Sequence, residues 1–91
     1  LVGHGDLVAQ VSQVYANAAA ALAGVGADLS AVAAETWFVT DMADFLAKGR
    51  AIGAIRRNAY GEDPPVAQTV VQVAGLYRPE ALVEVQFVGH V

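Results

Sequence analysis

The sequence predicts an α+β fold in which two helices pack on one face of a β-sheet. Helical and strand periodicities follow one another in the order helix, strand, helix, strand, strand, without an internal repeat or a linker. The 91 residues suffice for one domain, which we place at residues 1–91. Hydrophobic residues make up 56% of the chain and charged residues 15%. So small a monomer has too little interior for this many apolar side chains, and we expect some to contact another subunit.

The first helix is predicted to begin after Asp6, whose carboxylate can accept hydrogen bonds from free backbone N–H groups as an N-cap. Apolar residues then recur at spacings of three and four, which is the pattern of one helix face: Leu7, Val11, Val14, Ala18 and Leu22. Gly24 and Gly26 end this helix, because glycine accepts the left-handed conformation that is common at helix C-termini.

The first strand is predicted at residues 31–39, where the segment TWFV at 36–39 favours extended structure. Both faces of the strand are apolar, which is typical of a strand that is covered on both sides. The alanine-rich residues 31–34 are also compatible with a helical turn. We expect Trp37 to lie in the core.

The second helix is predicted to begin at a cap formed by Thr40 and Asp41. Its buried stripe consists of apolar side chains at helical spacing: Met42, Phe45, Leu46, Ile52 and Ile55. Gly49 and Gly53 lie inside this helix, and each weakens it by roughly 1 kcal/mol relative to alanine. A glycine at such a position also permits close approach of another backbone.

Arg56 and Arg57 stand in the last turn of this helix, where positive charge complements the helix dipole. We interpret both as helix-end stabilisation. A loop follows at residues 60–65 (YGEDPP), where a glycine and two prolines interrupt regular structure. Residues 66–73 are rich in valine and are predicted to form the second strand.

The last strand is predicted at residues 81–91, after a turn at residues 75–80. Its side chains alternate between two faces: Val83, Val85, Phe87 and Val91 on one, and Glu84, Gln86 and His90 on the other. With both helices on one side of the sheet, the opposite face and at least one strand edge stay uncovered. We expect another chain to cover them.

The charge balance argues against two classes of partner. The formal net charge is −4, the isoelectric point expected from the composition is about 4.8, and Lys and Arg together number five. Nucleic acids and anionic membranes both bind basic surfaces, so we expect neither as a partner. The longest apolar stretch, residues 18–25, is less than half of the roughly 20 residues that a membrane-spanning helix needs. No signal peptide is recognisable, and we expect a cytoplasmic location.

Metal and thiol chemistry have few candidate residues in this chain. It contains no cysteine, which excludes disulfides, cysteine-based zinc sites and thiol catalysis. Its two histidines, His4 and His90, stand near opposite ends of the chain, and neither belongs to an arrangement typical of a catalytic triad. We expect no metal and no cofactor.

Three ordered segments resemble the Rid family, also called the YjgF or endoribonuclease L-PSP family. They are residues 35–45 (ETWFVTDMADF), 64–76 (PPVAQTVVQVAGL) and 81–87 (ALVEVQF). The resemblance implies a chorismate-mutase-like fold with a mixed sheet, assembled as a homotrimer with small-molecule clefts between neighbouring subunits. It also implies hydrolysis of reactive enamine or imine intermediates to 2-keto acids and ammonia, without a metal or an organic cofactor. Family members usually start with a strand pair that is not found within residues 1–91.

The resemblance also points to the residues of a site. Gln68 stands where the family has the arginine that binds the substrate carboxylate, and Thr69 follows it in the same short motif. Gly49 aligns with an asparagine of the second helix. Glu84 aligns with the first glutamate of an E-x-E pattern in the final strand, and Gln86 replaces the second glutamate. Gln68, Thr69 and Gly49 are therefore candidate substrate-binding residues, and Glu84 is the candidate catalytic residue.

The candidate residues suggest definite chemistry. Gln68 carries a neutral amide with two N–H donors, so it suits a neutral amide, carbonyl or hydroxyl better than a carboxylate. Arg78, in the turn before the last strand, is a candidate for the missing charge, although nothing in the sequence places it in a cleft. Glu84 is either a general base that activates water or a polar residue on an exposed or lumen-facing side of a strand. Tyr15 and Thr69 are candidate hydrogen-bond donors, and packing is the alternative role for each.

Two classes of function follow from these observations. The first is a hydrolase or deaminase that acts on an imine-type or enamine-type metabolite in an intersubunit cleft. The second is a non-catalytic protein of the same kind that binds a metabolite or regulates a partner. A ribonuclease, suggested by the family's other name, is disfavoured by the acidic composition, because RNA contact favours basic surfaces.

Overall fold

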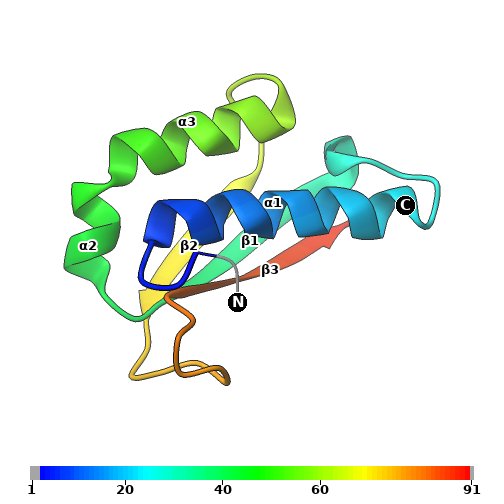
Figure 1. The fold of residues 1–91 in the computed structure, drawn as a ribbon. Coiled ribbons are helices and arrows are strands. Elements are labelled where there is room, and N and C mark those ends of the chain that lie inside the picture. Colours follow the sequence, from blue (N-terminus) through cyan, green and yellow to red (C-terminus); the bar gives the residue numbers. More distant parts are fainter. Residues whose placement is uncertain (1–2, 91) are drawn as a thin grey trace.

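In the computed structural model, which describes residues 3–90, the helices lie on one face of a three-stranded sheet (Figure 1). The elements in chain order are α1 (Leu7–Ala23), a 3₁₀ helix (Leu29–Ala31), β1 (Val32–Val39), α2 (Met42–Ala47), α3 (Gly49–Tyr60), β2 (Ala67–Gln72) and β3 (Val83–Gly89). This arrangement confirms the predicted α+β class, with helices packed on one face of a mixed sheet.

The strand order of the sheet is β2-β1-β3, with β1 parallel to β2 and antiparallel to β3. Trp37 lies in β1 between Val70 of β2 and Val85 of β3. Parallel strands need a crossover connection, and α2 and α3 provide it between β1 and β2. Alternate side chains of the central strand β1 therefore point toward the helices on one face of the sheet and toward the opposite surface on the other.

The core lies between the sheet and the helices. Its buried side chains come from four elements: Leu7, Val11 and Tyr15 of α1, Trp37 and Val39 of β1, Ile52 of α3 and Val83 of β3. The Trp37 ring contacts the rings of Tyr15 and Phe45, with centroids 6.3 and 5.8 Å away. Such tilted and edge-on contacts stabilise aromatic packing beyond the burial itself. The predicted place of Trp37 in the core is confirmed.

The first helix begins after Asp6 as predicted and ends at Ala23, but of the two glycines predicted to be left-handed there, Gly24 is right-handed, with a φ of −63°. The Asp6 carboxylate accepts a hydrogen bond from the Ala9 amide at 3.1 Å, as an N-cap should. Gly26 has a φ of 75°, a left-handed conformation that reverses the chain after the helix. The chain then forms the 3₁₀ helix Leu29–Ala31, so β1 begins at Val32, one residue later than predicted.

The second helix differs from the prediction because it divides at Lys48. Lys48 has φ −102° and ψ 14°, outside the helical region, and it separates α2 from α3. The change of axis leaves Leu46 68% exposed, so its predicted place in the buried stripe was wrong. The other members of that stripe pack against the core: Met42, Phe45, Ile52 and Ile55. Asp41 caps α2 by accepting from the Asp44 amide at 3.0 Å.

The last strand is shorter than predicted, since β3 spans Val83–Gly89, and Val91 lies outside the described residues. Gly89 passes very close to the start of β1. A Cβ atom at Gly89 would lie 2.1 Å from the Ala31 carbonyl oxygen, so no other residue fits there. The same carbonyl accepts a hydrogen bond from the His90 amide at 2.9 Å. This contact fixes the register at the end of the β1–β3 pair.

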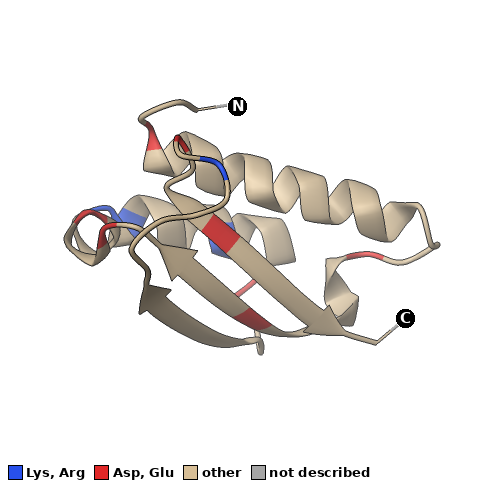
Figure 2. Cartoon of the chain, turned by 90° about the horizontal axis from the view of Figure 1, so that it is seen from below, with Lys and Arg blue, Asp and Glu red and all other residues tan. Residues whose placement is uncertain are grey.

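The sheet face away from the helices is uncovered within the described residues (Figure 2). The strand registers place on it Thr36 and Phe38 of β1, Thr69 and Val71 of β2, and Glu84, Gln86 and Val88 of β3. Val71 and Val88 are 39% and 59% exposed. The outer edges of β2 and β3 pair with no strand among residues 3–90. An uncovered face and edge were predicted, but β1 is covered on one side only.

Candidate functional site

Two of the predicted site residues, Gly49 and Gln68, line one cavity of about 260 Å³ beside α3. We call it the α3 pocket, and it is lined by Phe45, Gly49, Ile52, Gly53, Arg56, Arg57, Asp63, Pro64 and Gln68. Several segments form its walls, namely α2, α3, the loop that follows α3, and the edge strand β2. The grouping of Gly49 with Gln68 agrees with the resemblance on which both were predicted.

The sheet register places Gln68 in this pocket. Gln68 lies beside Glu35, whose side chain is buried on the helical side of the sheet, so both side chains leave the sheet on that face. Because β2 is an edge strand, the Gln68 side chain stays exposed instead of entering the core. Gly49 begins α3, and a Cβ atom there would meet no other atom within 4 Å. The wall at Gly49 is therefore open.

Thr69 is not part of the α3 pocket. It lies beside Thr36 of β1, on the uncovered face of the sheet. Successive residues of a strand point to opposite faces, so Gln68 and Thr69 cannot contact the same small ligand in one chain. A role for Thr69 toward a ligand in the α3 pocket would need a different chain.

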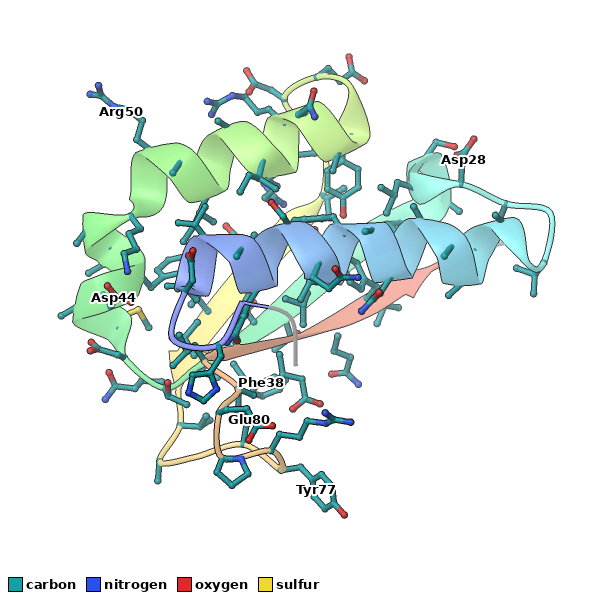
Figure 3. The ribbon with its side chains drawn as sticks, in the orientation of Figure 1. Asp28, Phe38, Asp44, Arg50, Tyr77 and Glu80 are labelled. Carbon is teal, nitrogen blue, oxygen red and sulfur yellow. The ribbon has the colours of Figure 1, made fainter. Side chains whose placement is uncertain are left out.

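Glu84 also points to the uncovered face, where it lies beside Phe38. It lines a second cavity of about 280 Å³, together with Leu76, Tyr77, Arg78, Ala81 and Val83. The structure thus brings Arg78 and Glu84 to one cavity, a grouping that the sequence did not indicate. Tyr77 is fully exposed, and its side chain extends outward from the loop that forms this cavity (Figure 3).

Gln68 and Glu84 are far apart within a chain. They lie on opposite faces of the sheet, on strands that flank β1 on either side. Their partners on β1, Glu35 and Phe38, are separated by three positions. Strand rise and spacing then put their Cα atoms roughly 14 Å apart. A small ligand that contacts both residues must lie between two chains.

The most connected polar residue of the core is Glu35, which the sequence-based search for functional residues missed. Its side chain is fully buried, and its carboxylate accepts four hydrogen bonds. Oε2 accepts from the hydroxyls of Tyr15, at 2.7 Å, and Tyr60. Oε1 accepts from Trp37 Nε1 and Arg56 Nε, each at 2.9 Å. The available signal was a single charged residue in the strand segment VAAETWFV.

The four donors set the protonation state of Glu35. Burial raises the pKa of a carboxyl group, but the hydrogen bonds from Tyr60, Tyr15, Trp37 and Arg56 outweigh it, so the pKa of Glu35 lies below its ordinary value. Burial and the hydrogen bond to Glu35 both raise the pKa of Tyr15 and of Tyr60. The carboxylate is therefore ionised and both phenols are neutral near pH 7.

Arg56 connects this buried carboxylate to the α3 pocket. Its Nε donates to Glu35, its Nη2 donates to the Val66 carbonyl at 2.9 Å, and its guanidinium lies 5.8 Å from the centre of the Tyr60 ring. Burial lowers the pKa of Arg56, but the hydrogen bond and charge of Glu35 raise it by more. The prediction that Arg56 stabilises the helix end was wrong, because its guanidinium forms an ion pair with Glu35 of β1 instead. Arg57 occupies the last turn as predicted.

A sequence model of the endoribonuclease L-PSP family matches residues 1–91. The chain belongs to this family. Protein DfrA from Myxococcus xanthus is 39% identical over 74 residues, which are 81% of this chain and 53% of DfrA. The chain thus spans about half the length of that curated relative.

Solved structures support the same membership of the endoribonuclease L-PSP family. YyfB from Yersinia pestis, a Rid-family protein of unknown function, has a TM-score of 0.86 and 33% identity, and the match covers 100% of this chain and 67% of the YyfB chain. Rv2704 from Mycobacterium tuberculosis, of the YjgF/YER057c/UK114 family, has a TM-score of 0.77 and 30% identity, and the match covers 94% of this chain and 69% of the Rv2704 chain. The YjgF-type fold that the sequence predicted is confirmed.

Two further properties bear on the function of this member of the family. Within residues 3–90, no group of three or more His, Asp or Glu side chains is arranged to hold a metal ion. No helix among the described residues is long and apolar enough to cross a membrane. His4 and His90 are both exposed, and they stand at opposite ends of the described chain.

Proposed function

We propose that the protein is a small-molecule hydrolase or deaminase that acts on an imine or enamine metabolite. Membership of the family supports the class of chemistry. The observation that carries the proposal is the α3 pocket, which brings Gln68 and Gly49 together around a space of small-metabolite size. Both residues stand at positions that the family resemblance marks for substrate binding, although they are 19 positions apart in the sequence.

The site is completed by a second copy of the chain, in a homotrimer. Glu84 is too far from Gln68 to act on the same small ligand within one subunit. The uncovered sheet face, with Phe38, Val71 and Val88, offers apolar surface for such an assembly. Burial of this face between subunits would also account for the excess of apolar residues in the sequence.

Glu84 acts as a general base in this proposal. Its carboxylate accepts a proton from water as the water oxygen bonds to the imine carbon, and the imine nitrogen takes up a proton. The resulting carbinolamine loses its hydroxyl proton as the C–N bond breaks, which releases ammonia and leaves a carbonyl compound. An enamine first takes a proton at carbon to become the imine. The sequence consumes one water and needs no oxidant or reductant.

Hydrolysis of an imine generated in situ by an amino-acid oxidase tests the proposal. The purified protein should accelerate loss of the imine above the rate in buffer. The variant Glu84→Gln should lower that acceleration by about 100-fold or more, because general bases contribute factors of this size. Glu62→Gln removes the same charge from the exposed loop after α3 and should have no effect. No acceleration with acidic and with neutral imines would reject an enzymatic role.

A non-catalytic, metabolite-binding protein of the same family is the second candidate. It is favoured by Gln68, a neutral residue at the position where the resemblance leads one to expect the arginine that binds the substrate carboxylate. Retained binding of a keto acid without any turnover would support this candidate. A monomer in solution at all concentrations would exclude the intersubunit site in both versions. The cytoplasmic location and the absence of a cofactor stay predictions.

A further inference from the structure

The α3 pocket contains positive charge that the family-based comparison of β2 alone does not reveal. We propose that Arg57, assisted by Arg56 and Gln68, binds the carboxylate of a small acidic metabolite in this pocket. The charge that β2 lacks at Gln68 is thus supplied by the neighbouring helix. The inference rests on the proposed function only in taking this ligand to be the substrate, and it replaces the sequence-based expectation of a neutral one.

The Arg57 side chain lies in the α3 pocket, where it can contact a ligand. Gly49, Gly53 and Arg57 are four residues apart in α3, so they lie on one helix face. The Arg57 guanidinium folds back over Gly53, where its Nη1 lies 3.4 Å from the place that a Cβ atom would take. Both glycines leave this wall of the pocket without side chains. The guanidinium therefore borders open space in the pocket.

The pairing of Arg57 with Asp63 leaves its charge available. Arg57 Nε and Asp63 Oδ1 are 3.9 Å apart, beyond hydrogen-bond distance, and the two side chains are 54% and 92% exposed. An ion pair with this exposure and length contributes little, so a ligand carboxylate can displace Asp63. Asp63 is also the single acidic residue that lines the α3 pocket.

Arg56 supplies a fixed donor beside this mobile charge. Two of its three nitrogens are held, Nε by Glu35 and Nη2 by the Val66 carbonyl. Nη1 has no hydrogen-bond partner among residues 3–90 and is not a buried unsatisfied atom, so it is accessible to solvent, and Arg56 is one of the residues that line the pocket. The buried Glu35 carboxylate neutralises the charge of Arg56. Arg56 thus contributes geometry without loss of side-chain freedom on binding, while Arg57 contributes net charge.

The three donors match the needs of a carboxylate. Its two oxygens have about four acceptor sites, and arginine N–H groups bind them with short charge-assisted hydrogen bonds. The Gln68 amide adds a neutral donor from β2, opposite the helix. A volume of about 260 Å³ suits a ligand of few heavy atoms, such as a short keto or imino acid.

Binding of a keto acid, read by NMR titration, tests the inference without any turnover. Wild-type protein should bind 2-oxobutyrate at least tenfold more tightly than 2-oxobutyramide, its neutral amide, and added salt should weaken only the acid. Arg57→Gln should remove most of this preference. Arg50→Gln removes the same charge from the same helix, but Arg50 is exposed and points away from the protein body (Figure 3), so it should change nothing. Asp63→Asn should strengthen acid binding severalfold.

Two further variants sharpen the result. Gln68→Arg in the Arg57→Gln background should restore acid binding, because it returns charge to the same pocket from β2. Arg78→Gln should leave binding unchanged, since Arg78 lines the cavity at Glu84 instead. Three outcomes would each overturn the inference. The first is a loss of acid binding with Arg78→Gln but not with Arg57→Gln, and the second is an equal loss with Arg50→Gln and Arg57→Gln. The third is that wild-type protein binds the acid and the amide with equal affinity.

The two proposals can fail separately. Acid-selective binding that depends on Arg57, without imine hydrolysis, would leave the carboxylate site and reject the enzyme. Hydrolysis with a KM that Arg57→Gln does not change, and with equal rates for acidic and neutral imines, would leave the enzyme and reject the carboxylate site.

Discussion

Arg56 Nε donates a hydrogen bond to Glu35 Oε1 at 2.9 Å, and this ion pair joins α3 to the central strand β1. The Arg56 side chain is 15% exposed and that of Glu35 is fully buried. Tyr15 brings α1 to the same carboxylate. The two long helices and the sheet therefore meet at one charged group inside the core, where every member of the network depends on the others.

Removal of Arg56 should destabilise the fold strongly. In Arg56→Met the Glu35 carboxylate stays buried without its counter-charge, and we expect a loss of about 3 kcal/mol or more in the free energy of unfolding. Arg57→Met, one position along the same helix, should cost about 0.5 kcal/mol or less because that side chain is half exposed. Urea denaturation of both variants measures the difference, and equal costs would mean that the buried pair contributes no stability.

The stability should decrease in acid through Glu35. Its pKa is lower in the folded chain than in the unfolded chain, so its contribution is fully present above the unfolded value of about 4.3. The contribution is lost as the pH falls from there through the lower folded value. Urea denaturation at pH values between 3 and 7 should therefore show a steeper loss in wild type than in Glu35→Gln, which has no group to protonate there. Identical slopes would contradict the lowered pKa.

Gly53→Ala should stabilise the protein by about 0.5–1 kcal/mol, because alanine is the better helix former and Arg57 Nη1 at 3.4 Å leaves room for the methyl group. Gly89→Ala should have the opposite effect, since its Cβ atom would overlap the Ala31 carbonyl. Thermal unfolding of both variants checks the contrast. A decrease for Gly53→Ala would show that the helix is packed more closely at that position than the structure indicates.

The uncovered sheet face should carry the contact between subunits. Val71→Glu places a charge on this face, next to Phe38, and should convert the expected trimer to smaller species. Val25→Glu introduces the same charge in the exposed turn after α1 and should leave the assembly intact. Size-exclusion chromatography with light scattering distinguishes the species. A trimer that tolerates Val71→Glu would place the subunit contact elsewhere.

Local features of the sequence predicted most of the secondary structure. Asp6 and Asp41 cap their helices as expected, because an N-cap needs only its own side chain and the next few backbone N–H groups. The period-two pattern of residues 83–88 located the last strand for a similar reason, since alternation is a property of the strand itself. The break at Lys48 was not foreseen, because the apolar spacing on either side of it fits one helix equally well.

The candidate site was only half predictable. Gly49 and Gln68 were named as candidates from the resemblance, and both line the α3 pocket, whereas Thr69 and Glu84 lie on the opposite face of the sheet. Glu35 was missed because a single glutamate in an apolar strand has no local signature of its partners. One donor, Trp37, lies two positions away on the same strand, but the other three lie 20, 21 and 25 positions away, and only the packing of α1 and α3 on β1 brings them to the carboxylate.

The sequence by itself determined the α+β class, the order of the elements and the uncovered face of the sheet, because these depend on periodicity, caps and turns within short segments. The family was indicated by the resemblance of three ordered segments to known members. The tertiary structure alone decided which charged and polar side chains lie together, such as Glu35 and Arg56. It placed Gln68 and Glu84 on opposite faces of the sheet, and it turned Arg56 and Arg57 of one helix toward the same pocket. Such contacts depend on strand register and on the way a helix lies across a sheet, which join residues that no local pattern connects.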